Sequence, residues 1–281
     1  MIPTPFDYER ANSVAQALTL LEQGGEDASL LAGGHSLLPL MRLRLARPTL
    51  LVDIGRLDDL RYVSIDGDHI LIGALTTHHE LADSSELEGA CPLLSATARQ
   101  IGDPQVRHRG TIGGSVAHAD PASDLPAALL ALDAEVVLQG SDGSRTVAAA
   151  DFFEGPFMSA LGDAEMLTAI RVPVSSASAS YHKFQRRAQD WAIVWVAAVV
   201  EHDGGTITNA AIGLTNMGGT PLRAPAVEAA LVGAESDDAI AAAAAQVGDL
   251  GLPPGDDQAS PEYRQHLAEV LIRRAVRELV S

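Results

Sequence analysis

Two pairs of adjacent glycines, Gly33-Gly34 and Gly113-Gly114, constrain the fold of this chain more than any other sequence feature. Each pair follows an apolar segment, has a hydroxyl residue close by and precedes a segment that can be helical. Glycine allows a backbone to approach an anion closely, and consecutive N–H groups at a helix N-terminus create local positive potential. Two such turns from separate segments suit a diphosphate held from two sides. The competing interpretation is two tight turns without a ligand, because neither has the G-x-G-x-x-G spacing of the usual dinucleotide fingerprint.

The charge balance excludes some partners and requires any anion site to be local. The 281 residues include 19 basic and 37 acidic side chains, which gives a formal net charge of −18. Because phosphate contacts need clustered Lys and Arg, this balance excludes nucleic acid and disfavours an anionic membrane surface. Arginines nevertheless flank both glycine turns: Arg42, Arg44 and Arg47 follow the first, and Arg107 and Arg109 precede the second. We expect local positive potential there, unless these are ordinary solvated side chains.

Two residue types that occur once limit the chemistry. Lys183 is the only lysine, which excludes a P-loop, and Cys91 is the only cysteine, which excludes an iron–sulfur cluster or cysteine-ligated zinc site held by this chain. A lone cysteine fits a reducing cytoplasm. The His78-His79 pair lacks the H-E-x-x-H spacing of a zinc site. The first nine residues show no signal-peptide pattern, and no apolar run reaches the roughly 18 residues that span a bilayer.

Hydrophobic periodicity and turn residues predict short strands that alternate with helices. Strands at 29–32 and 50–54 around a helix at 37–44 form a βαβ-like unit. The middle of the chain is predicted to contain strands at 69–75 and 166–174, a hairpin at 135–147 and helices at 78–82, 92–101 and 124–132. The polar segment 175–180 marks a domain boundary. Beyond it we predict strands at 181–187, 193–201 and 206–215 and helices at 225–231, 237–247 and 261–279.

Three motifs resemble a known family. The stretches Ala32 to Met41, Thr111 to Ser115 and Pro121 to Asp124 are similar to the FAD-binding medium subunit of molybdenum hydroxylases. The nearest branch is aerobic carbon monoxide dehydrogenase, and the xanthine and N-heterocycle dehydrogenases are relatives. The resemblance covers nearly the whole chain. Two spaced motifs in the same order make it specific for FAD and much less specific for a substrate.

The resemblance implies roles for individual residues. One side of the diphosphate would be lined by Ala32, Gly33, Gly34, His35, Ser36 and Leu37, and the other by Thr111, Ile112, Gly113, Gly114 and Ser115. Asp124 would meet the ribityl or ribose hydroxyls, Ile101 would pack near the flavin ring, and Leu167 would lie near the adenine end or the ring edge. Lys183 would lie near the isoalloxazine, and Asp190 and Trp191 belong to the loop that approaches the ring.

Two residues depart from the family pattern. Ser115 stands where the family usually has Asn, so that one side-chain contact is lost or mediated by water. Trp191 stands where the nearest branch tends to have Tyr, so that a hydroxyl bond to the ring is missing. For Gly113 we predict a positive φ, which valine adopts only at high cost, and therefore loss of FAD in Gly113→Val.

The fold implied by the resemblance is α+β: a two-lobed FAD-binding domain of the PCMH type, followed by a C-terminal domain of antiparallel sheet and helices. The expected ranges are 1–57 for the first lobe, 58–175 for the second and 176–281 for the C-terminal domain with a three-stranded sheet. The implied function is electron transfer from iron–sulfur clusters of a partner subunit through FAD to an external acceptor, with aerobic carbon monoxide dehydrogenase as the first choice of enzyme.

The resemblance also implies partners, because no catalytic or metal-binding residue is expected in this chain. Molybdopterin would belong to a large subunit and the 2Fe–2S clusters to a small one, in a dimer of heterotrimers. The complex would be cytoplasmic, with peripheral association with the inner membrane as an option. The alternatives are the medium subunit of a xanthine or N-heterocycle dehydrogenase, a free-standing flavin reductase or oxidase, and a non-catalytic scaffold that has lost flavin.

Overall fold

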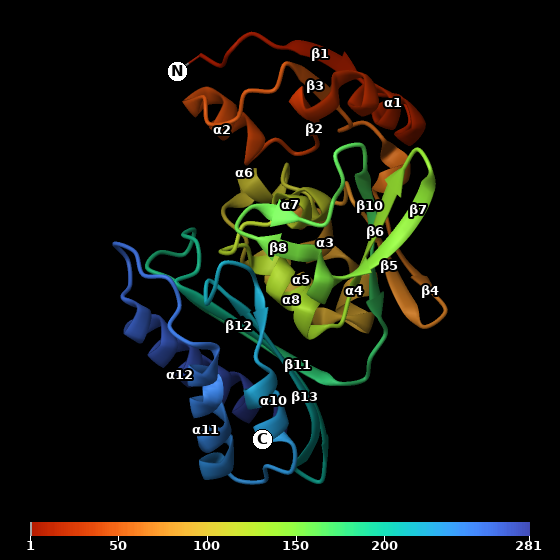
Figure 1. Cartoon of the computed structure of the whole chain (residues 1–281). Coiled ribbons are helices and arrows are strands. Elements are labelled where there is room, and N and C mark those ends of the chain that lie inside the picture. The colour runs from red at the N-terminus through yellow and green to blue at the C-terminus, as the bar shows by residue number, and fades with distance from the viewer. Residues whose placement is uncertain (1) are drawn as a thin grey trace.

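The computed structural model describes residues 2–281, which form three main β-sheets with their covering helices (Figure 1). The N-terminal sheet is parallel, with the strand order β1-β3-β2. Its elements are β1 (Asp7–Arg10), α1 (Val14–Gly24), β2 (Ala28–Leu31), α2 (Leu37–Leu43) and β3 (Leu50–Asp53). The predicted βαβ-like unit is therefore present as β2, α2 and β3. The sequence pattern does not predict β1, because all four of its residues are exposed and carry no apolar alternation.

The middle sheet is antiparallel, with the order β4-β5-β10-β6-β7. Its strands are β4 (Val63–Asp66), β5 (His69–Gly73), β6 (Glu135–Gly140), β7 (Gly143–Ala148) and β10 (Met166–Pro173). The helices beside it are α3 (His78–Asp83), α4 (Ser85–Ala90), α5 (Pro92–Arg99), α6 (Pro104–Arg107), α7 (Ile112–His118) and α8 (Asp124–Ala131). A short helix and a two-stranded ribbon follow β7, namely α9 (Ala149–Phe152), β8 (Phe153–Gly155) and β9 (Met158–Ser159).

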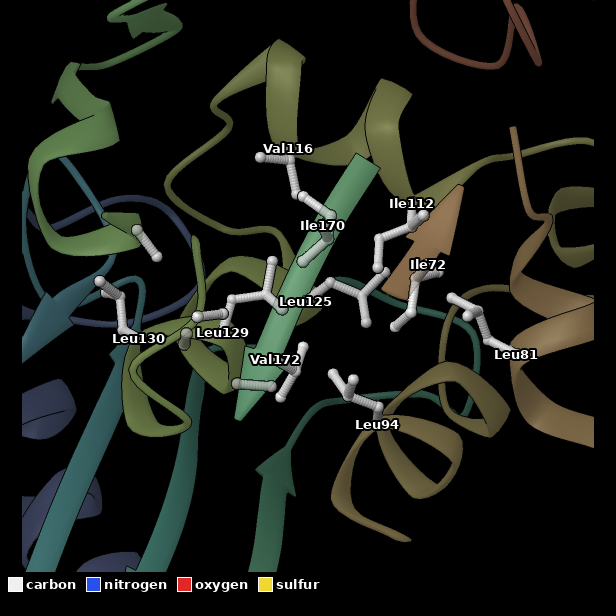
Figure 2. Packing of buried hydrophobic residues seen from close by; sticks show 14 of the residues in the cluster. Ile72, Leu81, Leu94, Ile112, Val116, Leu125, Leu129, Leu130, Ile170 and Val172 are labelled. Atoms are coloured by element: carbon white, nitrogen blue, oxygen red, sulfur yellow. The ribbon is translucent and has the colours of Figure 1, made fainter. Parts of the chain in front are cut away.

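The largest apolar core fixes α7 and α8 against this sheet. Figure 2 shows Ile72 of β5 and Ile170 of β10 among the side chains of Ile112 and Val116 of α7 and Leu125 of α8, all of them fully buried. Burial of each such side chain contributes roughly 1.5–3 kcal/mol. The two helices that follow the second glycine pair are therefore rigid parts of the core.

The C-terminal sheet is covered on both faces. Its strands β11 (Ser178–Phe184), β12 (Val194–Asp203), β13 (Thr206–Thr215) and β14 (Leu222–Arg223) are antiparallel in that order, and its helices are α10 (Pro225–Leu231), α11 (Asp237–Ala245) and α12 (Pro261–Val280). These helices lie on one face (Figure 1). On the other face α8 comes so close that a Cβ on Gly213 would lie 2.0 Å from the Ala127 carbonyl oxygen. The expected three-stranded sheet was wrong by one strand, because β14 has only two residues and no readable period.

Helix composition gives no sign of a bilayer span. Within residues 2–281, no helix combines the length and the apolar character needed to cross a membrane.

Candidate functional site

A cavity of about 560 Å³ lies between the N-terminal lobe, at the top of Figure 1, and the helices of the middle sheet. This volume is within the range of about 300–1,000 Å³ that is usual for small-molecule and cofactor sites. Fourteen of the predicted site residues line it: Ala32, Gly33, Gly34, His35, Ser36, Leu37, Ile101, Thr111, Gly113, Gly114, Ser115, Asp124, Leu167 and Trp191. Residues from both glycine pairs, far apart in sequence, thus face one space.

The first glycine pair belongs to a loop with free backbone donors. Residues 33–36 connect β2 to α2, and Gly34 has a φ of +76°, which a residue with a Cβ adopts only with strain. Among residues 2–281, no backbone or side-chain acceptor takes a hydrogen bond from the N–H groups of residues 33–36. Four consecutive amide donors at the start of a helix therefore remain available to an anion in the cavity. We call residues 33–36 the open loop.

The second glycine pair lies inside a helix, and its amide groups are already bonded. Thr111 caps α7: its Oγ1 accepts from Gly114 at 3.2 Å, and its carbonyl accepts from Ser115 at 3.0 Å. The N–H of Gly113 donates to the carbonyl of Ala74 at 2.9 Å. The predicted positive φ of Gly113 is wrong, because this residue is helical. Glycine is needed instead for close packing, since a Cβ here would lie 2.6 Å from the Cβ of Ala74.

The side chain of Ile112 does not face the cavity. It is fully buried in the core of Figure 2, and its N–H donates to the Thr76 carbonyl at 3.0 Å. Neither end of this residue is free to contact a ligand. Of the second motif, the Thr111 and Ser115 hydroxyls and the surfaces of the two glycines remain to line the cavity.

The two glycine segments touch each other. A Cβ on Gly33 would lie only 2.1 Å from the carbonyl oxygen of Arg109, and a Cβ on Gly110 would lie 2.8 Å from the ring of His78. No side chain fits at Gly33 without separating the N-terminal lobe from the segment that leads into α7. Gly33 thus closes one end of the cavity by backbone-to-backbone contact.

The arginines that flank the glycine turns do not supply the expected potential through direct contact. None of Arg42, Arg44, Arg47, Arg107 and Arg109 lines the cavity. Arg107 donates to the carbonyls of residues 101 and 102 at 3.0 and 3.2 Å, and the other four are exposed on the surface. The amides of the open loop and the start of α2 are sources of positive potential that face the cavity directly.

A buried ion pair joins Asp124 of the cavity wall to Lys183. Lys183 donates to Oδ2 of Asp124 at 2.9 Å, and the two side chains are only 4% and 7% exposed. Lys183 also donates to the Gln100 carbonyl at 3.2 Å. Oδ1 of Asp124 is buried without a hydrogen-bond partner among the described residues, although Asp124 lines the cavity. Burial raises the pKa of Asp124, and the ammonium of Lys183 opposes that rise.

Lys183 therefore acts from behind Asp124. It does not line the cavity, so the expectation that it lies against a flavin ring has no direct support from its position. Its side chain is buried, so it is not an ordinary surface lysine. Asp190 of the predicted set is half-buried in the loop between β11 and β12 and also lies off the cavity wall.

Three of the predicted residues add apolar surface to the cavity wall. Leu167 of β10 is 5% exposed, and Ile101 is half-buried just after α5. Trp191 is 56% exposed at the rim, so that its indole is free to cover a planar ligand. Ser115 is engaged with the N-cap residue of α8, because its hydroxyl lies 2.7 Å from that of Ser123.

Several cavity residues carried no usable sequence signal. Leu161, Gly162, Asp163, Glu165 and Met166 reach the cavity from the turn before β10 and from its first residue, a segment without a motif. His78 was considered only as a zinc ligand, yet it is a buried wall residue. Within residues 2–281, no cluster of three or more His, Cys, Asp or Glu could hold a metal ion.

Comparison with known families identifies the class of protein. Residues 4–175 match the family described as the FAD-binding domain in molybdopterin dehydrogenase, and residues 179–279 match the CO dehydrogenase flavoprotein C-terminal domain. The chain therefore belongs to the family of FAD-binding chains of molybdopterin dehydrogenases, as its motifs predicted. The predicted α+β fold class is confirmed with it.

Particular relatives are similar over their whole length. The chain is 43% identical to the carbon monoxide dehydrogenase medium chain of Afipia carboxidovorans, over 98% of this chain and 97% of that one. It is 39% identical to the glyceraldehyde dehydrogenase medium chain of Sulfolobus acidocaldarius, over 99% and 100%. A solved structure of carbon monoxide dehydrogenase from Hydrogenophaga pseudoflava matches with a TM-score of 0.97 at 42% identity, over 99% of this chain and 98% of that one.

Proposed function

We propose that this chain is the FAD-carrying electron-transfer subunit of a molybdenum hydroxylase, and specifically of a carbon monoxide dehydrogenase. The observation that carries the proposal is a single cavity lined both by the open loop, with its free amide donors, and by Asp124, whose Oδ1 has no hydrogen-bond partner among the described residues, in a chain of this family. The carbon monoxide assignment rests on the 43% identity to a carbon monoxide dehydrogenase medium chain and on the match of residues 179–279.

The cavity residues fit FAD in type and position. The amides of the open loop and the hydroxyls of Ser36 and Thr111 are donors for the diphosphate. Asp124, held by Lys183, is an acceptor for a sugar or ribityl hydroxyl through its free Oδ1. Ile101, Leu167 and Trp191 offer apolar surface to the ring systems. When bound, FAD supplies the redox chemistry, while the chain supplies position and electrostatics.

The chain needs partner subunits for the rest of the electron path. Cys91 is its only cysteine and is buried, and burial raises the pKa of its thiol to about 11. This cysteine is therefore a structural residue, and the iron–sulfur clusters belong to another chain. We propose a large molybdopterin subunit and a small iron–sulfur subunit as partners, in a dimer of heterotrimers. We further propose that the complex is cytoplasmic and approaches the inner membrane only as a peripheral assembly.

Two experiments test the function. The purified full-length chain, loaded with FAD, is expected to be yellow with flavin absorption and a stoichiometry of one FAD per chain. A chain that takes up no FAD would contradict both electron transfer and a free-standing reductase.

Co-purification is expected to recover a large and a small partner, and the assembled complex should oxidise CO in preference to purines, other N-heterocycles and glyceraldehyde. Oxidation of one of those other substrates without CO would keep the flavin role and replace the enzyme.

A further inference from the structure

His78 is a buried titratable residue that the proposed function leaves unused. It is the first residue of α3, and its side chain reaches the cavity wall where the open loop meets the segment before α7. Its backbone N–H donates to the Gly110 carbonyl at 3.0 Å, which holds the ring beside that junction. The residue is 5% exposed, and Nδ1 of its ring is buried without a hydrogen-bond partner among the described residues. A buried polar atom without a partner costs folding free energy, and a hydrogen bond to a bound ligand can remove that cost.

Among the described residues, no carboxylate compensates a charge on this ring. The charged groups that face it are His35 from the open loop and Arg107 from α6, and both oppose its protonation. On its own helix, His79 pairs with Asp83 at 3.3 Å, and Glu80 accepts from the Thr77 backbone at 2.7 Å. Burial is the largest cause and lowers the pKa of His78 to about 4, so the ring is neutral at pH 7.

We propose that His78 is an anion-binding residue of this cavity, and that it takes up a proton when the diphosphate of FAD binds between the open loop and Thr111. The inference rests on the proposed function, since it assumes a diphosphate at that junction. His78 adds a donor that neither glycine motif contains. It also supplies a positive charge only when the anion is present, which spares the empty cavity a buried cation beside His35 and Arg107.

The sign of the pH dependence follows from linkage. The free chain holds His78 neutral above a pKa of about 4. A dianion beside the ring raises that pKa in the complex, so the complex binds more protons than the free chain. FAD affinity therefore increases as pH falls between the pKa of the complex and that of the free chain, by at most about tenfold per pH unit for one proton. The diphosphate diester of FAD stays ionised in this range, so the proton belongs to the protein.

The test is a titration of the flavin-free full-length chain with FAD between pH 5.5 and 8.5. Calorimetry in two buffers of different ionisation enthalpy counts the protons taken up, and flavin fluorescence gives the dissociation constant. For the unaltered chain we expect net proton uptake and a severalfold lower dissociation constant at pH 6 than at pH 8. In His78→Gln, which keeps a polar group of similar size but cannot gain charge, we expect proton uptake to fall and the pH slope to flatten.

Matched variants assign the proton. His79→Gln changes a neighbour that pairs with Asp83 outside the cavity, and is expected to leave proton uptake unchanged. His35→Gln changes the histidine of the open loop; a smaller loss of proton uptake than in His78→Gln supports the proposal, and a larger loss would overturn it. Equal uptake in His78→Gln and the unaltered chain would overturn the proposal.

Two further measurements distinguish failure of this proposal from unfolding of the variant and from failure of the proposed function. If His78→Gln unfolds, histidine-ring NMR of the unaltered chain decides: FAD must shift the His78 ring signals toward the protonated form, and unchanged signals would overturn the inference. If FAD does not bind to the unaltered chain at any pH, the proposed function fails. If FAD binds with no proton uptake, only the role of His78 fails.

Discussion

The two glycine segments look alike in sequence and differ in what they do. The open loop keeps its amide groups free and has Gly34 at a φ of +76°. The segment Thr111 to Ser115 is a capped helix start whose amide groups from Ile112 to Ser115 are bonded to the chain itself, and whose core face is buried. We call this segment, together with the Asp124–Lys183 pair, the fixed wall. The contrast leaves one glycine pair with free amide groups that suit an anion, as proposed above, while the other pair allows the wall to pack tightly.

Removal of the cation in the fixed wall is expected to give the largest effect. Lys183→Met leaves the carboxylate of Asp124 buried without its partner, and breaking a buried pair in this way costs about 3–5 kcal/mol of the free energy of unfolding. Burial then raises the pKa of Asp124 further, and the protonated carboxyl can no longer accept as an anion from FAD. We expect a much lower melting temperature and weaker FAD binding, measured by calorimetry.

The pH dependence of this variant separates its cause from simple loss of packing. A carboxylate whose folded pKa lies above its unfolded value destabilises the folded state at high pH, and this cost disappears as pH falls through the folded pKa. The stability deficit of Lys183→Met should therefore be smaller at pH 5 than at pH 8. Lys183→Arg, which keeps the charge, should recover part of the stability. A deficit that is independent of pH and equal in both variants would assign the loss to packing alone.

Disturbing the close packing of the fixed wall is expected to give the next largest effect. Gly113→Ala places a Cβ 2.6 Å from that of Ala74, and overpacking of a rigid core costs about 1–3 kcal/mol. Denaturant unfolding is expected to show this loss, with reduced FAD content as a consequence. Gly89→Ala is the matched control: Gly89 lies in the helix α4, where a Cβ meets nothing within 4 Å, so that variant should be neutral or more stable. Equal stability of the two variants would refute the packing role.

The sequence predicted the order of most elements and which segments surround the cavity, because apolar periods and glycine turns are local signals. It could not distinguish a free loop from a bonded helix start, since the conformations and hydrogen bonds of Gly34 and Gly113 depend on distant segments that pack against them. The same limit applies to Lys183, whose partner is 59 residues away in the chain. His78 was missed because burial beside Gly110, and not a motif, makes it unusual.

A substitution in the open loop should reduce FAD affinity more than folding stability, whereas substitutions in the fixed wall should mainly reduce stability. Gly34→Ala forces a Cβ into positive φ, which costs about 1 kcal/mol of folding stability. The greater loss is expected in FAD affinity, because a shift of this backbone misaligns free amide donors that have no hydrogen-bond acceptor within residues 2–281. Flavin fluorescence titration beside thermal melting checks the ratio of the two effects. A variant that lost stability while it bound FAD normally would show that the open loop has a structural role and does not bind the cofactor.

The smallest effect is expected at the contact that joins the fixed wall to α8. The hydroxyls of Ser115 and Ser123 lie 2.7 Å apart, and a hydrogen bond of this kind contributes about 0.5–1.5 kcal/mol net. Ser115→Ala removes it and leaves the capping of α7 by Thr111 unchanged. Denaturant unfolding should report a loss in that range. Ser115→Asn restores the amide that the family usually has, and is expected to bind FAD more tightly than Ser115→Ala does. If the alanine and asparagine variants bound FAD equally well, the second glycine motif would contact the cofactor through no side chain at this position, and its role would be packing throughout.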